Sequence, residues 1–316
     1  MSSKPLVILN PHSGGGRAGA AAEELCAVLE RHVGAFDVAL TERPRHAVGL
    51  AEAAAIAGRP AVIAVGGDGT IHEVVNGLML GRAAGHRPPT LGIVGQGTGG
   101  DFRKSLGLEH RLDRYCEAIA SGRTRSVDVG RFAYTNDDGA RAEAWFVNIL
   151  SVGMGGLVDR YVARASRSLG GTVAYLGASV RALWQSEVGE LACQLHRGGT
   201  VEALDLATRS LAICNGQYFG SGMHVAPMAR LDDGLFDVVS MGAAPKLRFM
   251  LSSLSIYKGK HVDNPAVSVH ACDRIVIELA NEGIRDRFPL DVDGEPLGLL
   301  PIDVRVEPGA LSVFSG

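Results

Sequence analysis

The segment Gly66-Gly67-Asp68-Gly69-Thr70 constrains the fold of this chain most, because it directly follows the apolar run 61–65. A short run rich in β-branched residues predicts a buried strand, and the residues from Ile71 onward have helical spacing. Glycines let the backbone turn sharply and approach a ligand closely. The sequence therefore predicts a strand, a glycine-rich turn and a helix N-terminus, which together bind phosphate through backbone N–H groups.

An aspartate inside such a turn indicates more than simple anion binding. The carboxylate of Asp68 would repel a neighbouring phosphate unless a cation lay between them. Mg²⁺ carried by a nucleotide meets this requirement, because it binds carboxylate and phosphate oxygens. The simpler alternative is an ordinary strand-to-helix turn.

The composition narrows the class of protein. A chain of 316 residues with 46% hydrophobic residues suits one large or two ordinary domains. The net charge of −3 argues against a nucleic-acid partner. The five cysteines lack metal or redox spacing, and we find neither a signal-peptide pattern nor an apolar stretch long enough to span a bilayer. We therefore expect a soluble cytoplasmic protein in a reducing compartment.

The first part of the chain alternates predicted strands and helices. The strands are expected at 6–9, 36–40, 62–65 and 91–94, and the helices at 17–32, 47–57, 71–80 and 112–121. This order predicts an α/β domain whose parallel sheet is covered on both faces. Ligands of such sheets bind beyond the carboxyl ends of the strands, and polar, glycine-rich turns follow Leu9, Val65 and Val94.

Strand-like runs dominate after about Val129, which predicts an antiparallel β domain with inserted helices. The strands are expected at 144–150, 191–196, 210–214, 236–241, 274–279, 304–307 and 311–314, and the helices at 158–186 and 246–257. We therefore divide the chain into domains at 1–129 and 130–316, and the pattern leaves open a return of the last strand to the first domain.

Further segments carry a resemblance to a known family. Two of them are glycine-rich turns, Asn10-Pro11-His12-Ser13-Gly14 and Gly95 to Phe102. A third segment contains Asn215-Gly216, Gly220-Ser221-Gly222-Met223 and Ala226-Pro227 and is followed by the acidic stretch 231–237. The last is Asp291-Val292-Asp293-Gly294-Glu295. In this order they resemble the diacylglycerol kinase catalytic-domain family, which includes sphingosine and ceramide kinases and bacterial soluble lipid kinases. The bacterial branch is the most similar in length.

The resemblance implies an α/β nucleotide domain followed by a β-sandwich domain, as in NAD kinases and diacylglycerol kinases. It also implies that ATP and a lipid meet in a cleft between the domains. There, a hydroxyl of diacylglycerol or a related lipid is phosphorylated with ATP as donor and Mg²⁺ as cofactor. A NAD kinase and a non-catalytic regulator that binds nucleotide or lipid are the alternatives.

The three glycine-rich turns supply the expected nucleotide contacts. We expect Gly66, Gly67 and Gly69 to donate N–H groups to the phosphates, Thr70 to cap the following helix, and Asn10 to fix the first turn. Arg17 either reaches the phosphates or is an ordinary exposed arginine. The remaining candidate nucleotide contacts are Ser13, Gly14, Gly97, Thr98 and Asp101.

Two groups of aspartates are candidate magnesium ligands. Asp68, Asp101 and Asp128 are expected to hold the nucleotide Mg²⁺, although a strand-end role explains Asp128 equally well. The family resemblance also implies a structural Mg²⁺ on the loop that contains Asp232, Asp233 and Asp237, whose alternative is a solvated turn.

Asp293 is the candidate general base carried over from the family's Asp-Gly-Glu segment, and Glu295 would support the base or the metal. The rival assignment makes Asp68 the base and Asp293 a metal partner. Asp-Gly is also a strong hairpin signal.

The chain departs from the family in its third turn. Gly100 stands where the family has Asn, and Arg103-Lys104 replaces the family's Ala-Arg. Lysine lacks the bidentate fork of arginine, so these changes bear on nucleotide binding.

A lipid kinase must visit a membrane surface, so we expect transient membrane association. One face of a predicted helix carries Arg160, Arg164 and Arg167. This basic face either binds an anionic membrane surface or is an ordinary solvated face. A second copy of the chain, forming a homodimer, is a further expected partner.

Overall fold

The computed structural model describes residues 4–97, 99–136, 138–164, 177–178 and 181–316. Contacts between Cα atoms divide the chain into two units. The first consists of Met1–Val129, Trp145–Val147 and Pro308–Gly316, and the second of Gly130–Ala144 and Asn148–Glu307. The last residues of the chain therefore belong to the first unit.

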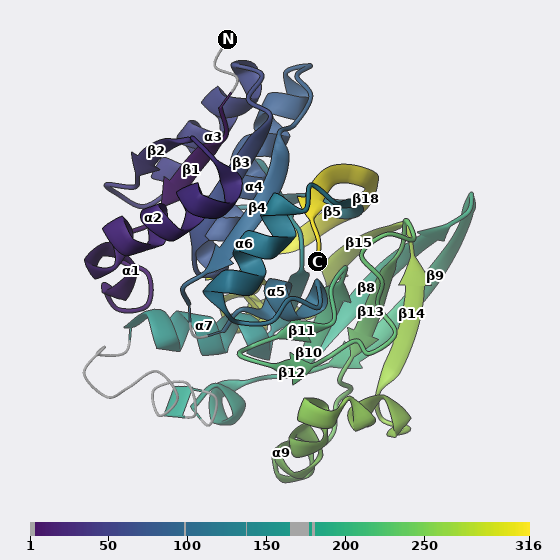
Figure 1. Ribbon diagram of the computed structural model, residues 1–316. Helices are drawn as coiled ribbons and strands as arrows, with labels where there is room; N and C mark the ends of the chain where they lie inside the picture. The colour runs from purple at the N-terminus through teal and green to yellow at the C-terminus, as the bar shows by residue number, and fades with distance from the viewer. Residues whose placement is uncertain (1–3, 98, 137, 165–176, 179–180) are drawn as a thin grey trace. The chain divides into compact units, whose positions relative to one another are not determined.

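The first unit contains the parallel sheet that the sequence predicts. Its strands are β1 (Leu6–Leu9), β2 (Asp37–Leu40), β3 (Ala61–Gly66) and β4 (Thr90–Gly95), in the order β2-β1-β3-β4 (Figure 1). Every neighbouring pair is parallel, and the end of β18 (Leu299–Phe314) joins β4 in parallel through Val313 and Leu91. The strands are fully buried in β1 and β3, which explains their continuous apolar runs.

Helices cover this sheet in two pairs: α2 contacts α6, and α3 contacts α4. The helices of the unit are α1 (Arg17–Ala20), α2 (Ala22–Val33), α3 (His46–Ile56), α4 (Asp68–Ala83), α5 (Asp101–Ser105) and α6 (Leu112–Ala120). In the sheet order β2-β1-β3-β4, the connection from β1 to β2 runs toward one edge of the sheet. The connections from β2 to β3 and from β3 to β4 run toward the opposite edge. Right-handed connections therefore place α2 on one face and both α3 and α4 on the opposite face.

Small residues let α3 and α4 approach closely. A Cβ atom added at Gly77 of α4 would lie 2.2 Å from the carbonyl oxygen of Val48 in α3. One at Gly81 would lie 2.5 Å from the Cβ of Ala55. Backbone contact at this distance excludes any side chain larger than glycine without a shift of the helices.

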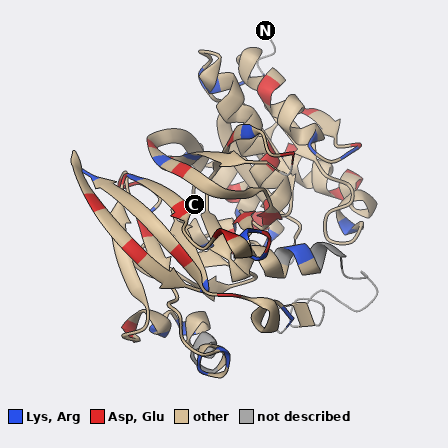
Figure 2. Ribbon diagram, turned by 180° about the vertical axis from the view of Figure 1, so that it is seen from behind, with Lys and Arg blue, Asp and Glu red and all other residues tan. Residues whose placement is uncertain are grey.

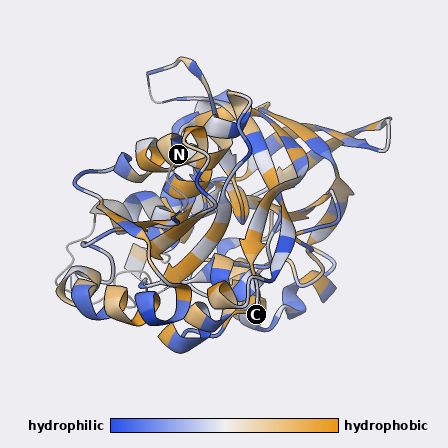
Figure 3. Ribbon diagram, turned by 45° about the horizontal axis from the view of Figure 1, so that its top comes forward, coloured by the Kyte–Doolittle hydropathy of each residue, from blue (hydrophilic) through white to orange (hydrophobic). Residues whose placement is uncertain are grey.

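The second unit is built from antiparallel strands, as the sequence predicts. One sheet has the strand order β14-β13-β10-β7-β16-β17. A second set of paired strands has the order β9-β8-β15-β18, in which β15 pairs with the first part of β18. The strands are β7 (Ile149–Gly153), β8 (Gly189–Arg197), β9 (Thr200–Thr208), β10 (Ser210–Cys214), β11 (Tyr218–Phe219), β12 (Met223–His224), β13 (Phe236–Ser240), β14 (Ser268–Cys272), β15 (Arg274–Leu279), β16 (Leu290–Val292) and β17 (Glu295–Pro296). Two further strands, β5 (Thr124–Thr135) and β6 (Arg141–Phe146), have residues in both units. Alternate residues of β8 are buried, and the long hairpin formed by β8 and β9 shows alternating hydropathy in Figure 3.

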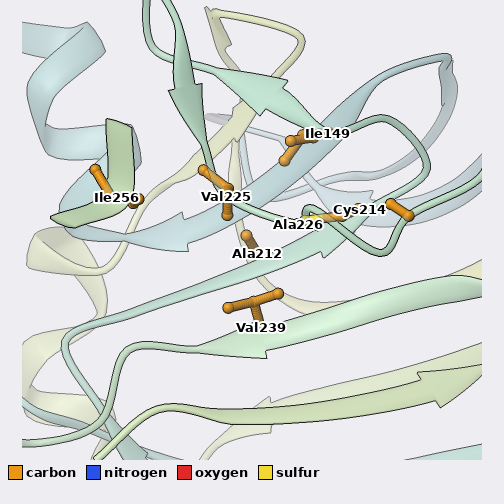
Figure 4. Packing of buried hydrophobic residues seen from close by; sticks show 8 residues of the cluster. Ile149, Ala212, Cys214, Val225, Ala226, Val239 and Ile256 are labelled. Carbon is orange, nitrogen blue, oxygen red and sulfur yellow. The ribbon is translucent and has the colours of Figure 1, made fainter. Parts of the chain in front are cut away.

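Helical segments connect these strands. They are α7 (Met154–Arg164), α9 (Lys246–Ser253) and the 3-10 turns η2 (Leu254–Lys258), η3 (Lys260–Asp263) and η4 (Glu282–Arg287). A buried cluster joins η2 to the sheet: Ile149, Ala212 and Val239 from the strands pack with Ile256 from η2 (Figure 4). None of the described helices is long and apolar enough to cross a membrane.

Several elements differ from their predicted bounds. The run 144–150 is broken into β6 and β7 at Asn148, and the runs 304–307 and 311–314 form one continuous strand, β18. The predicted helix 71–80 begins earlier, at Asp68. Helix α7 begins at Met154, before the predicted helical stretch 158–186, whose residues 165–176 and 179–180 lie outside the described residues.

Candidate functional site

The three glycine-rich turns of the first unit meet at one edge of the parallel sheet. The pairs Leu9–Val65 and Gly66–Gly95 bring the carboxyl ends of β1, β3 and β4 together. The ladder extends into the turns, because the N–H group of Gln96 donates to the carbonyl oxygen of Gly66 over 2.8 Å. A Cβ atom at Gly14 would lie 2.6 Å from the Gln96 carbonyl oxygen, so the first and third turns touch.

Asn10 fixes the first turn, as expected. Its Oδ1 accepts the N–H group of His12 over 3.0 Å, and its Nδ2 donates to the Thr70 hydroxyl over 3.0 Å. The Ser13 hydroxyl accepts the N–H group of Gly67 over 3.3 Å and so links the first turn to the second. Gly14, Gly15 and Gly16 all have positive φ angles, of 63°, 73° and 91°, which explains the run of glycines.

The prediction that Thr70 caps the helix is wrong. The N-cap residue of α4 is Gly67 and no side chain caps it, because the helix already begins at Asp68. Thr70 is a buried residue of the first turn of α4, where its hydroxyl faces Asn10 and packs on Gly66.

Arg17 points back to its own turn. Its Nε donates to the carbonyl oxygen of Gly14 over 2.9 Å, and the residue is exposed. Arg17 thus stabilises the left-handed run of glycines in this structure.

Asp68 connects the second turn to the third. Its Oδ2 accepts the N–H group of Gly100 over 2.8 Å, and its Oδ1 accepts that of Phe102 over 3.4 Å. Burial raises the pKa of Asp68, the neighbouring carboxylate of Asp101 raises it further, and the backbone N–H groups of the third turn oppose both effects. A cation near the two carboxylates would stabilise ionised Asp68, and so offset the effects of burial and of Asp101 on its pKa.

The carboxylates of Asp68 and Asp101 fit a nucleotide-bound Mg²⁺ better than a metal held by protein alone. Among the described residues, no three His, Cys, Asp or Glu side chains converge to hold a metal ion. Mg²⁺ in nucleotide sites is commonly held by one or two carboxylates together with phosphates and water. Asp101 is buried, and its Oδ1 lies 2.9 Å from Nζ of Lys104.

Gly100 explains part of the chain's departure from the family pattern. It adopts the left-handed conformation (φ 60°, ψ 42°), which glycine and asparagine accept more readily than other residues. The change from Asn to Gly therefore preserves the left-handed backbone conformation and removes a side-chain amide group. Nε of Arg103 lies 3.0 Å from the position of a Cβ atom at Gly100, so the arginine occupies the space beside it.

A cavity of about 110 Å³ opens between the second and third turns. Its lining combines glycine backbone with Asp68 and three basic side chains, namely Arg103, Lys104 and His110. Burial lowers the pKa of His110, and the positive charges of Arg103, Arg17 and Lys104 lower it further. The positive charges of Arg103 and Lys104, together with backbone N–H groups, suit a polyphosphate. Gly66, Gly67 and Gly97 line this cavity, whereas Thr98 lies outside the described residues.

Asp128 has a structural partner. It is buried in β5, and its Oδ1 accepts the N–H group of Gly309 over 2.7 Å. This bond ties β5 to β18 and gives Asp128 a structural role, although it lies inside β5 and not at a strand end as the alternative supposed.

Asp293 occupies the hairpin between β16 and β17, as the Asp-Gly signal predicts. Its φ angle is 53°, which is uncommon for a residue other than glycine and often marks a functional position. Its Oδ1 accepts the N–H groups of Asn148 and Ile149, each over 3.0 Å. Glu295 is exposed in β17.

Three supporting residues of this hairpin were not singled out from the sequence. Asp291 is fully buried and accepts the N–H group of Gly294 over 3.0 Å and the Ser151 hydroxyl over 3.3 Å. Nδ2 of Asn148 donates to the carbonyl oxygen of Tyr218 over 2.7 Å. The one available signal was an asparagine that interrupts an otherwise apolar run.

The acidic loop brings two of its three aspartates together. Burial and the neighbouring Asp233 raise the pKa of Asp237 to about 6. Asp233 accepts the N–H group of Leu235 over 3.1 Å. Asp232 instead pairs with Arg230 over 3.3 Å.

Two family models match the chain. Residues 4–132 match the diacylglycerol kinase catalytic domain, and residues 148–315 match the YegS C-terminal NAD kinase beta sandwich-like domain. A probable lipid kinase YegS-like protein of Chromohalobacter salexigens is 30% identical over 264 residues, which cover 84% of this chain and 78% of that protein. A diacylglycerol kinase of Mycobacterium tuberculosis is 30% identical over 315 residues, which cover 98% and 94%.

Solved structures share the fold. A diacylglycerol kinase of Bacillus anthracis superposes with a TM-score of 0.69 at 21% identity, covering 99% of this chain and 97% of the other. Yeast NADH kinase superposes with a TM-score of 0.51 at 12% identity, covering 99% and 82%. On the evidence of the two family models and the relatives, this chain belongs to the diacylglycerol kinase catalytic-domain family of lipid kinases, in which that domain is followed by a YegS C-terminal domain.

Proposed function

We propose that this protein transfers the γ-phosphate of ATP to the hydroxyl group of a lipid, diacylglycerol or a related one, with Mg²⁺ as cofactor. The observation that carries the proposal is the cavity beside Asp68, which combines glycine backbone with Arg103 and Lys104. Phosphoryl transfer depends mainly on positioning and on neutralising charge. These groups supply both.

The first unit would hold the nucleotide. N–H groups of Gly66, Gly67 and Gly69 would donate to phosphate oxygens, while Arg103 and Lys104 would offset the phosphate charge. Asp68 and Asp101 would hold Mg²⁺, which neutralises charge on the phosphates as the bond to the leaving group breaks.

In the second unit, Asp293 would act as general base. The lipid hydroxyl oxygen bonds to the γ-phosphorus, the bond from phosphorus to the ADP oxygen breaks, and the hydroxyl proton passes to Asp293. The N–H groups of Asn148 and Ile149 hold one carboxylate oxygen in place for this role. Asp68 remains the rival base.

Transfer of labelled γ-phosphate from ATP to lipids in mixed micelles tests this function. The acceptors are diacylglycerol, ceramide, a sphingoid base and phosphatidylglycerol, with NAD as the acceptor that the NADH kinase fold suggests. We expect the labelled phosphate to appear in a lipid product when Mg²⁺ is present. Chelation of Mg²⁺ with EDTA should abolish this transfer. Label in NADP alone would replace the proposal with a NAD kinase, and no transfer to any acceptor would favour a non-catalytic protein.

A further inference from the structure

The second unit exposes large apolar side chains on two segments that are joined to each other. Trp184 is 70% exposed and Leu247 is 67% exposed, the two highest values among large apolar side chains of the described residues. Single exposed apolar residues are normal on protein surfaces. These two are not isolated, because Nζ of Lys246 donates to the carbonyl oxygen of Trp184 over 2.5 Å.

A buried arginine holds the two segments in register. Arg209 is 9% exposed. Its Nε donates to the carbonyl oxygen of Ala244 over 2.9 Å, and its Nη1 donates to that of Ser186 over 3.2 Å. Ser186 follows Trp184 by two residues and Ala244 precedes Lys246 by two. The surface is thus preorganised by the protein interior.

Helix α9 turns one apolar face inward and another outward. Phe249 is buried, whereas Leu247 and Met250 are exposed, Met250 by 42%. At about 100° per residue, Leu247 and Met250 lie roughly 60° apart and Phe249 lies roughly 200° from Leu247. The protein interior therefore accounts for Phe249, while Leu247 and Met250 are exposed on the outer face of α9.

Basic side chains lie on α9 and in the segments near Trp184. Lys246 and Arg248 belong to α9, where Figure 2 shows basic residues, and Arg181 lies over the ring of Tyr161 at 4.7 Å. Beside Trp184, a cavity of about 510 Å³ is lined by Arg160 and Arg287 together with Glu187 and Asp286. Among these described side chains the basic ones outnumber the acidic ones.

We infer that Trp184 and the outer face of α9, namely Leu247 and Met250 flanked by Lys246 and Arg248, form a docking surface for an anionic lipid bilayer. Tryptophan favours the membrane–water interface, and basic residues beside an apolar face bind anionic lipids. The charge of the surface selects this partner. The inference rests on the proposed function in one respect only, that the acceptor lipid lies in a bilayer.

The chain provides its own optical probe. It has two tryptophans, of which Trp145 is 5% exposed and Trp184 is 70% exposed. In the full-length Trp145→Phe variant, Trp184 alone reports on its surroundings. We expect phosphatidylglycerol–phosphatidylcholine vesicles to shift its emission to shorter wavelength and brominated lipids to quench it, while pure phosphatidylcholine vesicles have little effect.

Paired variants separate the charged and apolar contributions. Lys246→Gln with Arg248→Gln should weaken binding to anionic vesicles about thirtyfold at low salt, the factor that about 1 kcal/mol for each of two basic residues gives. Leu247→Ser with Met250→Ser should reduce binding at high salt as well. The matched controls are Arg197→Gln with Arg305→Gln, and Val201→Ser, all at exposed positions elsewhere in the unit, and they should change binding less than threefold.

The vesicle measurements contain no nucleotide or acceptor, so they stand apart from the kinase assay. An unchanged Trp184 emission on anionic vesicles would overturn the docking surface, as would equal losses in the surface variants and their controls. Activity on a short-chain soluble diacylglycerol should stay unchanged in all variants. Vesicle binding without lipid phosphorylation would contradict the proposed function and leave the docking surface standing.

Discussion

The carboxylate of Asp68 has a structural role beside the role in metal binding that we propose for it. It accepts N–H groups from Gly100 and Phe102 and so holds the third turn against the second. Asp101 and burial together raise its pKa. Ionised Asp68 is therefore costly in the protein alone, and a bound cation would offset the cost.

Replacing Asp68 with Asn should abolish most Mg²⁺-dependent activity. The amide keeps one acceptor oxygen for the third turn but removes the charge that would bind the metal, so we expect kcat/KM to fall at least about hundredfold, as for loss of a major electrostatic contact. Steady-state rates over a Mg²⁺ titration measure this, and thermal unfolding checks the fold. Near-wild-type turnover of a folded variant would contradict the metal assignment.

Asp293→Ala separates binding from chemistry. If Asp293 is the base, kcat should fall by roughly 10²–10⁴-fold, the usual contribution of a general base, while ATP affinity measured by calorimetry stays close to wild type. Glu295→Gln, at an exposed position of the same hairpin, is the control with a smaller expected effect. Loss of ATP affinity with unchanged kcat would instead assign Asp293 to the nucleotide metal.

The acidic loop should make stability depend on pH. Asp237 has a pKa of about 6 against a reference of 3.8, so the folded protein holds this proton more tightly than the unfolded chain. Stability from this group is therefore fully present below about pH 4 and is lost as pH rises through about 6.

Asp237→Asn should accordingly raise the unfolding temperature at pH 7 more than at pH 4. If the loop binds Mg²⁺, millimolar Mg²⁺ should stabilise the wild type at pH 7 and not the variant. Equal Tm shifts at both pH values would mean that Asp237 is not perturbed as described.

At the scale of elements, contact between α3 and α4 depends on Gly77. Alanine favours helix over glycine by about 1 kcal/mol, but its Cβ would meet the Val48 carbonyl oxygen at 2.2 Å. Gly77→Ala should therefore lower the free energy of unfolding despite its better propensity. Gly49→Ala is the matched control: it lies in α3 with nothing within 4 Å of its Cβ position and should be neutral or slightly stabilising in denaturant unfolding. A stabilised Gly77→Ala protein would show that the helices move apart freely.

The predicted elements succeeded where local pattern determines structure. The apolar runs before the three turns are buried parallel strands, and the Asp293-Gly294 pair is the expected hairpin turn. The failures come from distant partners. Asp68 starts α4 earlier than the apolar spacing indicates, and the broken run at Asn148 lies opposite Asp293, 145 residues later.

The same limit applies to the candidate site. Glycine-rich turns at neighbouring strand ends predicted a shared edge in the first unit. The contributions of Arg103, Asp291 and Ser151 could not be predicted, because their contacts depend on positive φ angles and on buried pairs far apart in the chain.

At the scale of the whole molecule, the chain enters the first unit more than once. Trp145–Val147 and Pro308–Gly316 belong to it, and each is held by residues of the first 129. Asn76 exchanges hydrogen bonds of 2.9 and 3.0 Å with the backbone of Trp145, and the N–H group of Ser315 donates to the carbonyl oxygen of Arg123 over 3.0 Å.

A fragment ending at residue 129 should therefore fold poorly. It would leave β4 without the end of β18 and Asn76 without its buried partner. We expect far-ultraviolet circular dichroism of residues 1–129 to show a broad, low-temperature transition, and addition of a peptide covering 304–316 to sharpen it. A cooperative transition of the fragment at the wild-type temperature would contradict this.

This interleaving limits how the protein can be recombined during evolution. A single crossover after residue 129 would separate the first unit from its closing segment, Pro308–Gly316. Exchange between relatives would keep the first unit whole only if the segments that encode residues 1–129 and 308–316 came from the same donor.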